Sequence, residues 1–82
     1  MDKSIHTREY ASVLRLLREA RNKAGITQVE LAKKIDETQS YVSKVERGEL
    51  RLDIVQLRKI CNVLGLSLSE FVNRFERETR RS

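Results

Sequence analysis

The sequence contains no proline and no tryptophan, and only three of its 82 residues are glycine and one is cysteine. It also has no apolar run approaching the roughly 20 residues that a membrane-spanning helix requires. The single thiol, Cys61, excludes an internal disulfide and indicates a reducing compartment. The opening segment, M-D-K-S-I-H-T, lacks the apolar stretch of a signal peptide. We therefore expect a cytoplasmic protein that does not associate with a membrane.

Metal, cofactor and catalytic chemistry find little support in the composition. His6 is the only histidine, and no cysteine or second histidine stands at ligand spacing from it. The sequence also lacks a glycine-rich phosphate loop and a cysteine and histidine dyad. Cys61 occupies a small-residue position on the apolar side of a predicted helix, where a thiol serves as core filler. We expect no enzyme, no metal site and no cofactor.

The charge is strongly positive, with 17 Lys and Arg against 12 Asp and Glu, a net +5 and a pI near 9.8. This excess favours a polyanionic partner, and charge alone leaves nucleic acid and a membrane surface open. The tail is a weak membrane binder, because it combines two phenylalanines with charges of both signs. Residues 1–82 are predicted to form a single domain, with an ordered core at about 8–78. A core this small would gain stability from a partner or a second copy.

Apolar residues at helical spacing, bounded by capping signals, predict five helices and no strand. Three helices open with a capping box, in which the side chains at the first and fourth positions bind each other's backbone amides. These boxes are Thr27 with Glu30, Asp53 with Gln56, and Ser67 with Glu70. Thr38 caps the third helix, and glycines follow the first, third and fourth helices as stops. The predicted spans are 7–24, 27–35, 38–47, 53–64 and 67–78, an all-α fold.

The third helix carries the functional argument, because one whole face of it lacks apolar residues. At about 100° per residue, Tyr41, Val42 and Val45 share one side and are predicted to pack inward. The opposite arc is polar and consists of Gln39, Ser40, Ser43, Lys44 and Arg47. Taken in isolation, such a face is as consistent with an ordinary solvated surface as with a binding surface.

The side chains of this arc match the edges of DNA bases. A glutamine amide pairs with adenine, a lysine donates to guanine, and serine allows close approach. Nearby groups suit phosphate, since the free amides at the start of the second helix attract anions. We assign base contacts to Gln39, Ser40, Ser43 and Lys44, and phosphate contacts to Gln28, Thr38, Arg47 and Arg51. Lys33 and Lys34 are either further phosphate contacts or simply solvated.

Arg21 falls on the apolar side of the first helix, where a charge requires a partner. Glu46 lies at the seam between the packed and exposed faces of the third helix. We predict that these two side chains form an ion pair that orients the third helix against the first. Its contribution is to orientation more than to net stability, because desolvation offsets much of the attraction.

With these residues in place, the chain resembles the Cro and lambda-repressor type of helix-turn-helix domain, the XRE family of bacterial and phage regulators. The resemblance covers roughly residues 14–71. It rests on T-Q-V-E-L-A at 27–32, Q-S-Y-V-S-K-V-E-R-G at 39–48 and L-R-K-I-C-N-V-L-G-L-S-L-S-E-F at 57–71. It implies a compact five-helix domain that binds a pseudo-palindromic operator in double-stranded DNA as a homodimer. The third helix would enter the major groove and the second would cross the backbone.

Carried over by position, the resemblance implies that Gln28 contacts phosphate and that Gln39 is the first base-reading residue. It also places Ser43 and Lys44 in the groove, Arg47 on the backbone, and Arg21 with Glu46 in the family's ion pair. The chain departs from some relatives at Ser40, where a longer side chain often reads a base. This departure leaves two alternatives for Ser40: it reads a base, or it touches only phosphate or a thymine methyl group.

Two questions stay open at this level. Phe71 is expected to close the core, whereas Phe75 either supplies a two-fold dimer contact, packs within the chain or lies on a frayed end. The functional prediction is a sequence-specific transcriptional regulator. The alternative is a protein-interaction module, such as the DNA-binding antitoxin half of a toxin–antitoxin pair. Steep salt dependence combined with a strong preference for one DNA sequence would separate the two.

Overall fold

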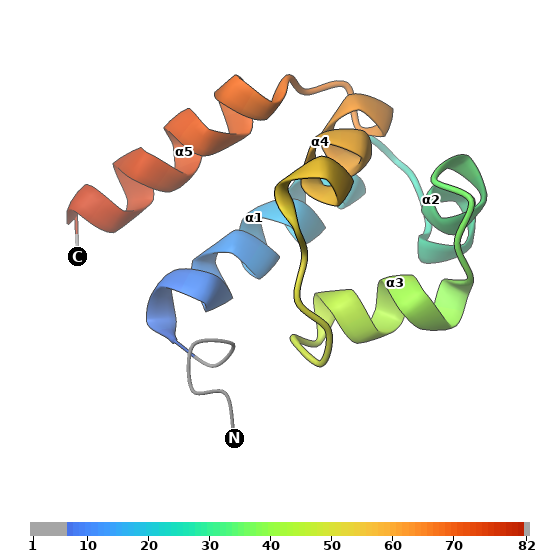
Figure 1. Ribbon diagram of the computed structural model, residues 1–82. Helices are drawn as coiled ribbons and strands as arrows, with labels where there is room; N and C mark the ends of the chain where they lie inside the picture. Colours follow the sequence, from blue (N-terminus) through green and yellow to red (C-terminus); the bar gives the residue numbers. More distant parts are fainter. Residues whose placement is uncertain (1–6, 82) are drawn as a thin grey trace.

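The computed structural model describes residues 7–81, which fold into five α-helices joined by short connections (Figure 1). The prediction of an all-α fold with five helices is confirmed for this part of the chain. The helices are α1 (Arg8–Lys23), α2 (Gln28–Lys34), α3 (Gln39–Glu46), α4 (Ile54–Val63) and α5 (Leu68–Arg81). The last of them continues beyond the expected end near Glu78. Glu78 binds Arg15 of α1, which holds the final turns of α5 against the domain.

The helix starts follow the capping signals. Thr7, Thr27, Thr38 and Asp53 each accept a hydrogen bond from the backbone N–H three residues later. The capping boxes of Thr27 with Glu30 and of Ser67 with Glu70 are both complete. The predicted box of Asp53 with Gln56 is wrong in one half. Asp53 accepts from the Gln56 backbone at 2.7 Å, but the Gln56 side chain donates to the Tyr41 hydroxyl at 3.3 Å.

The core is built from side chains that all five helices and their ends contribute. Phe71 of α5 is 2% exposed, so its predicted role in closing the core is confirmed, and Cys61 is fully buried as expected of core filler. Burial raises the pKa of the Cys61 thiol to about 11, which keeps it protonated and unreactive at neutral pH. The main buried cluster contains Leu17, Ala20, Leu31, Ala32, Ile35, Val42, Ile60, Cys61, Leu64 and Phe71.

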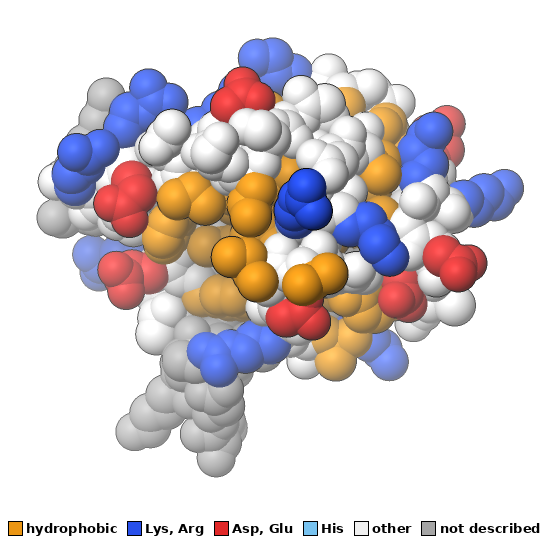
Figure 2. Space-filling view, turned by 45° about the horizontal axis from the view of Figure 1, so that its top comes forward, with side chains coloured by type: hydrophobic (Ala, Val, Ile, Leu, Met, Phe, Trp, Pro, Cys, Tyr) orange, Lys and Arg blue, Asp and Glu red, His pale blue; other side chains and the backbone are white. Residues whose placement is uncertain are grey.

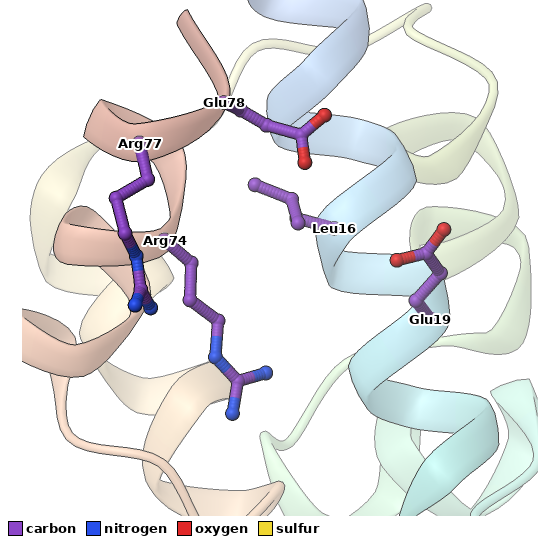
Figure 3. A pocket seen from close by; sticks show the side chains of 5 residues that line it. All are labelled: Leu16, Glu19, Arg74, Arg77 and Glu78. Carbon is purple, nitrogen blue, oxygen red and sulfur yellow. The ribbon is translucent and has the colours of Figure 1, made fainter. Parts of the chain in front are cut away.

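α5 is tied to α1 by a cluster of charges beside a groove of about 330 Å³. Figure 3 shows Glu19 and Leu16 on the α1 side of this groove, facing Arg74, Arg77 and Glu78 of α5. Glu19 and Glu78 both bind Arg15, so one guanidinium links two carboxylates from different helices. The cluster therefore contributes to the position of α5.

α3 lies at the edge of the molecule, on the side away from α5 (Figure 1). It packs on α2 and α1, while α5 packs on α1 and α4. The connection after α3 is held from α1, because the Tyr10 hydroxyl accepts a hydrogen bond from the Leu52 amide at 3.1 Å. This arrangement supports α3 from one side and leaves its other side open.

Candidate nucleic-acid interface

The open side of α3 is the polar arc. Val42 and Val45 are each 3% exposed and Tyr41 is half-buried, so these three side chains attach the helix to the domain. The side chains on the other side are at the surface: Gln39, Ser40, Lys44 and Arg47 are exposed, and Ser43 is half-buried. Ser43 is less accessible than the helical wheel suggested, because the Arg47 side chain lies over it and donates to its hydroxyl at 2.5 Å.

A tight turn sets the angle between α2 and α3. Ile35, at the end of α2, is buried, and the chain then reverses at Asp36, whose φ of 60° is the one positive value at a non-glycine residue in the described chain. Aspartate tolerates this left-handed conformation better than most residues, although glycine would adopt it with less strain. Thr38 then caps α3 through its hydroxyl, which accepts from the Tyr41 amide at 3.0 Å. The turn brings the first residues of both helices to the same surface.

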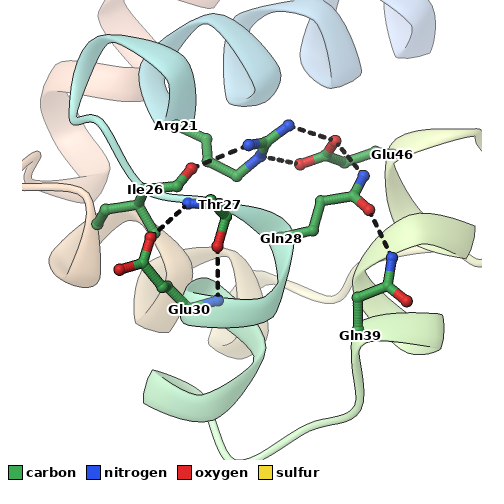
Figure 4. Close-up of polar contacts among 7 residues, drawn as sticks. All are labelled: Arg21, Ile26, Thr27, Gln28, Glu30, Gln39 and Glu46. Atoms are coloured by element: carbon green, nitrogen blue, oxygen red, sulfur yellow. Dashed lines mark hydrogen bonds and ion pairs between the residues drawn. The ribbon is translucent and has the colours of Figure 1, made fainter.

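Gln28 and Gln39, the first residues of α2 and α3, are in direct contact. The side-chain amide of Gln39 donates to the side-chain oxygen of Gln28 at 2.8 Å. Gln28 in turn donates to Oε1 of Glu46 at 2.9 Å. The two glutamines assigned separately to base and phosphate therefore form one hydrogen-bonded unit (Figure 4).

Arg21 of α1 and Glu46 of α3 form the inner end of this unit. Arg21 Nε lies 2.6 Å from Glu46 Oε2, and Nη2 lies 3.1 Å from Oε1. The third guanidinium nitrogen, Nη1, donates to the Ile26 carbonyl at 2.9 Å. The Arg21 and Glu46 side chains are only 12% and 9% exposed, so solvent screens this bidentate pair weakly. The pair joins α1, the connection to α2, and α3.

Arg47 has a carboxylate partner at the edge of the polar face. Its Nε lies 2.7 Å from Oε2 of Glu49, and both side chains are more than half exposed. The hydrogen bond to Glu49 raises the pKa of Arg47, and the same bond lowers the pKa of Glu49. An exposed pair of this kind is weak, so Arg47 can exchange Glu49 for another anion at little cost.

Three further basic residues considered for phosphate contact lie outside the first turns of α2 and α3. Arg51 is exposed in the connection between α3 and α4, and Lys33 and Lys34 are exposed in the last turn of α2. Within residues 7–81, no three His, Cys, Asp or Glu side chains gather as a metal site would require. His6 lies outside the described residues. None of the helices described is long and apolar enough to cross a membrane.

Comparison with known proteins identifies the family. A helix-turn-helix family model matches residues 17–71, which include the C-terminal part of α1, all of α2, α3 and α4, and the first turn of α5. A solved XRE-family like protein from Pseudomonas syringae pv. tomato str. DC3000 is 42% identical, has a TM-score of 0.85, and is covered over 94% of each chain. This chain is an XRE-type helix-turn-helix protein.

Two further relatives of the XRE-type chain carry descriptive names. The control protein C.MunI from a Mycoplasma species is 34% identical over 58 residues, which cover 71% of this chain and 78% of the relative. The clp gene regulator ClgR from Corynebacterium glutamicum has a solved structure that is 25% identical, with a TM-score of 0.77, over 88% of this chain and 77% of ClgR. By its family, the XRE-type chain is a DNA-binding transcription regulator.

Sequence reasoning missed contacts at the polar face of the XRE-type domain. The bond between Gln28 and Gln39 joins two helices, so no wheel drawn for a single helix could reveal it. The sequence analysis also gave no partner to Arg47, which binds Glu49. An acidic residue two positions after a basic residue expected at DNA was the available signal in the sequence.

Proposed function

We propose that the chain is a sequence-specific regulator that binds a pseudo-palindromic operator in double-stranded DNA as a homodimer. In this proposal α3 enters the major groove and α2 crosses the backbone. Gln39, Ser40, Ser43 and Lys44 approach base edges, while Gln28, Thr38, Arg47 and Arg51 approach phosphates. The domain acts in the cytoplasm, where its DNA is, and requires no metal or cofactor.

One observation carries the proposal: α3 is fastened to the domain by one face while its opposite face is polar, exposed and basic. The arc combines amide, hydroxyl and ammonium groups, which are the groups that read base edges. A B-DNA major groove about 12 Å wide accepts a single helix of this kind. The names of two relatives, a control protein and a clp gene regulator, also support a regulatory role.

The dimer part of the proposal is supported by apolar side chains left at the surface of α4 and α5. Ile54 and Val55 are 66% and 72% exposed and Val72 is 40% exposed, while Phe75 is half-buried. Figure 2 shows hydrophobic side chains gathered in a patch that Lys, Arg, Asp and Glu surround. A self-associating face of this kind would leave α3 of each copy free, because α3 lies on the other side of the domain from α5.

The test is selection of bound duplexes from a random pool, followed by titration of the winner at several salt concentrations. The proposal expects a two-fold symmetric motif with half-sites about one helical turn apart, roughly 10 base pairs. Affinity should fall steeply with salt while the preferred site stays about a thousandfold or more above random DNA. The double variant Gln39→Ala, Lys44→Ala is the control and should lose the motif while keeping salt-dependent binding.

Failure to enrich any motif would count against a sequence reader. The same fold would then serve the alternative role, in which it mainly binds a protein partner as an antitoxin does. An asymmetric motif with a single half-site would leave sequence reading in place and remove the homodimer from the proposal.

A further inference from the structure

The hydrogen bonds that join Arg21, Glu46, Gln28 and Gln39 converge on Glu46 (Figure 4). Arg21 donates to the carboxylate from the interior, and from the surface Gln39 donates to Gln28, which donates to the carboxylate. We propose that Glu46, which is too deep to touch DNA itself, determines which base Gln39 reads, by fixing the orientation of two amide groups in series. This inference rests on the proposed function, since it assumes that Gln39 meets a base edge. It makes Glu46 a positioning residue for specificity.

The direction follows from the chemistry of the end groups. A guanidinium only donates hydrogen bonds, and a carboxylate only accepts them. Oε1 of Glu46 accepts from Arg21 Nη2 at 3.1 Å and from Gln28 Nε2 at 2.9 Å, so Gln28 must point its amino group inward. The Gln28 oxygen then faces Gln39 and accepts from Gln39 Nε2 at 2.8 Å. Turning either amide over would place two acceptors or two donors against each other.

The consequence is a particular set of groups left on Gln39. One of its two N–H groups is occupied by Gln28, and its Oε1 and one N–H remain for DNA. One acceptor and one donor match adenine, which offers N7 as acceptor and N6–H as donor. Guanine offers two acceptors, O6 and N7, and would need both N–H groups of the amide. The unit therefore selects adenine and disfavours guanine at the base pair that Gln39 meets.

Replacing Glu46 with glutamine should reverse the direction of the series. Arg21 donates to both carboxylate oxygens, from Nε at 2.6 Å and from Nη2 at 3.1 Å, and a single amide oxygen can keep only one of these bonds. The shorter bond favours an oxygen at the place of Oε2, facing Nε, and Nη2 then loses its acceptor. The amino group of the new amide then takes the place of Oε1 and faces Gln28, which turns its oxygen inward and its amino group toward Gln39. Gln39 now accepts through its oxygen and presents both N–H groups outward, the pattern that fits guanine.

The experiment is selection from a random DNA pool with the full chain and with Glu46→Gln, followed by titration of operators that differ at one base pair. That base pair is the one whose preference disappears in Gln39→Ala. The expected result is a change from adenine to guanine there, with the ratio of the two affinities moving by about tenfold or more, since a bidentate pair discriminates by roughly 5- to 100-fold. The base pair that depends on Lys44 should keep its preference.

Circular dichroism melting of Glu46→Gln shows whether the variant is folded at the binding temperature. A merely structural role for Glu46 would lower affinity for all sites alike and leave the base preference unchanged. A folded Glu46→Gln protein that still prefers adenine therefore overturns the inference while leaving the proposed function intact. A wild-type protein that enriches no motif overturns the proposed function, and this inference falls with it.

Gln28→Met provides a second test that leaves the Arg21 and Glu46 pair in place. Methionine is close to glutamine in length but cannot pass on a hydrogen-bond direction. The ratio of adenine to guanine affinity should move toward one, because Gln39 is free to turn over. Adding Glu46→Gln to Gln28→Met should then have no further effect on this ratio. A change of preference to guanine in the double variant would overturn the inference.

Discussion

Single side chains of the polar face have different partners before any DNA is present. Arg47 binds Glu49 and donates to Ser43, whereas Lys44 is exposed. Gln39 is held by Gln28. The face is therefore partly organised in advance, with its flexible lysine free to adapt and its glutamine already oriented. These differences lead to separate expectations for each residue.

Lys44→Ala and Arg47→Ala should weaken DNA binding in different ways. Lys44→Ala is expected to relax discrimination at one base pair by about 1 to 3 kcal/mol, because a base-edge donor is lost. Arg47→Ala should weaken all sequences nearly alike and reduce the slope of log affinity against log salt by about one, because a phosphate contact is lost. Titrations of matched and single-mismatch operators at several salt concentrations measure both effects. Uniform loss in both variants would remove Lys44 from base reading.

Glu49→Gln should increase DNA affinity. Glu49 binds Arg47 in the free protein and places a negative charge beside the proposed phosphate contact. Removing that charge frees Arg47 and is expected to tighten binding by about two- to fivefold at low salt, with the gain fading as salt rises. Glu9→Gln is the control, since Glu9 is exposed in the first turn of α1 and does not belong to the polar arc of α3. An equal gain in both variants would indicate net charge alone.

At the scale of elements, the two capping boxes make helix stability depend on pH. Hydrogen bonds from the backbone and hydroxyl of Thr27 lower the pKa of Glu30 below its ordinary 4.5, and Ser67 does the same for Glu70. A carboxyl group whose pKa is lower in the folded state stabilises the fold above its ordinary pKa. This contribution is lost as the pH falls below about 4.5 and through the folded-state value.

Glu30→Gln with Glu70→Gln should therefore flatten the acid side of the stability curve. Glutamine retains part of each capping box but does not titrate. The difference in free energy of unfolding between wild type and the double variant should be present at pH 7 and shrink between about pH 4.5 and pH 3. Denaturant titrations across that range measure it. If this difference in free energy of unfolding does not change with pH, the titration of Glu30 and Glu70 does not contribute to acid sensitivity.

The turn between α2 and α3 gives a second expectation at this scale. Asp36 has a φ of 60°, a conformation that glycine adopts without steric cost. Asp36→Gly should raise the free energy of unfolding by a few tenths to about 1 kcal/mol, with loss of chain entropy opposing part of the gain. Gly25→Ala is the opposite control, because Gly25 has a φ of 72° and alanine would be strained there. Thermal melting would detect both changes, and a less stable Asp36→Gly would show that the aspartate side chain contributes more than the backbone strain.

For the whole molecule, the question is what covers the apolar side chains of α4 and α5. Val55 is 72% exposed in the free chain, so Val55→Asp should leave the fold intact and weaken self-association. Sedimentation velocity over a range of concentrations measures this, with circular dichroism as the check on folding. Val29→Asp is the matched control, because Val29 is 49% exposed on α2 and outside the proposed face.

Phe75→Ala should weaken both association and stability, since Phe75 is half-buried. Retention of dimers in Val55→Asp and Phe75→Ala would place the contact elsewhere.

Much of this protein could be predicted from its sequence by itself, because helix caps and amphipathic faces depend on residues three or four positions apart. The hydroxyls of Thr27 and Thr38, the inward side of α3, and the left-handed stop at Gly25 all belong to this class. They determined the five helices and the polar arc. The helical wheels of α1 and α3 also predicted an ion pair between Arg21 and Glu46, and the two side chains are in contact.

Contacts between helices were decided only by the tertiary structure. Gln28 and Gln39 meet because the strained turn at Asp36 sets the angle between α2 and α3. Two other contacts between helices likewise depend on how the helices pack. The Gln56 side chain donates to Tyr41 of α3 instead of completing its capping box, and Arg15 of α1 binds Glu78 of α5. Long side chains can reach several partners, and the crossing of helices decides which partner is close enough to bind.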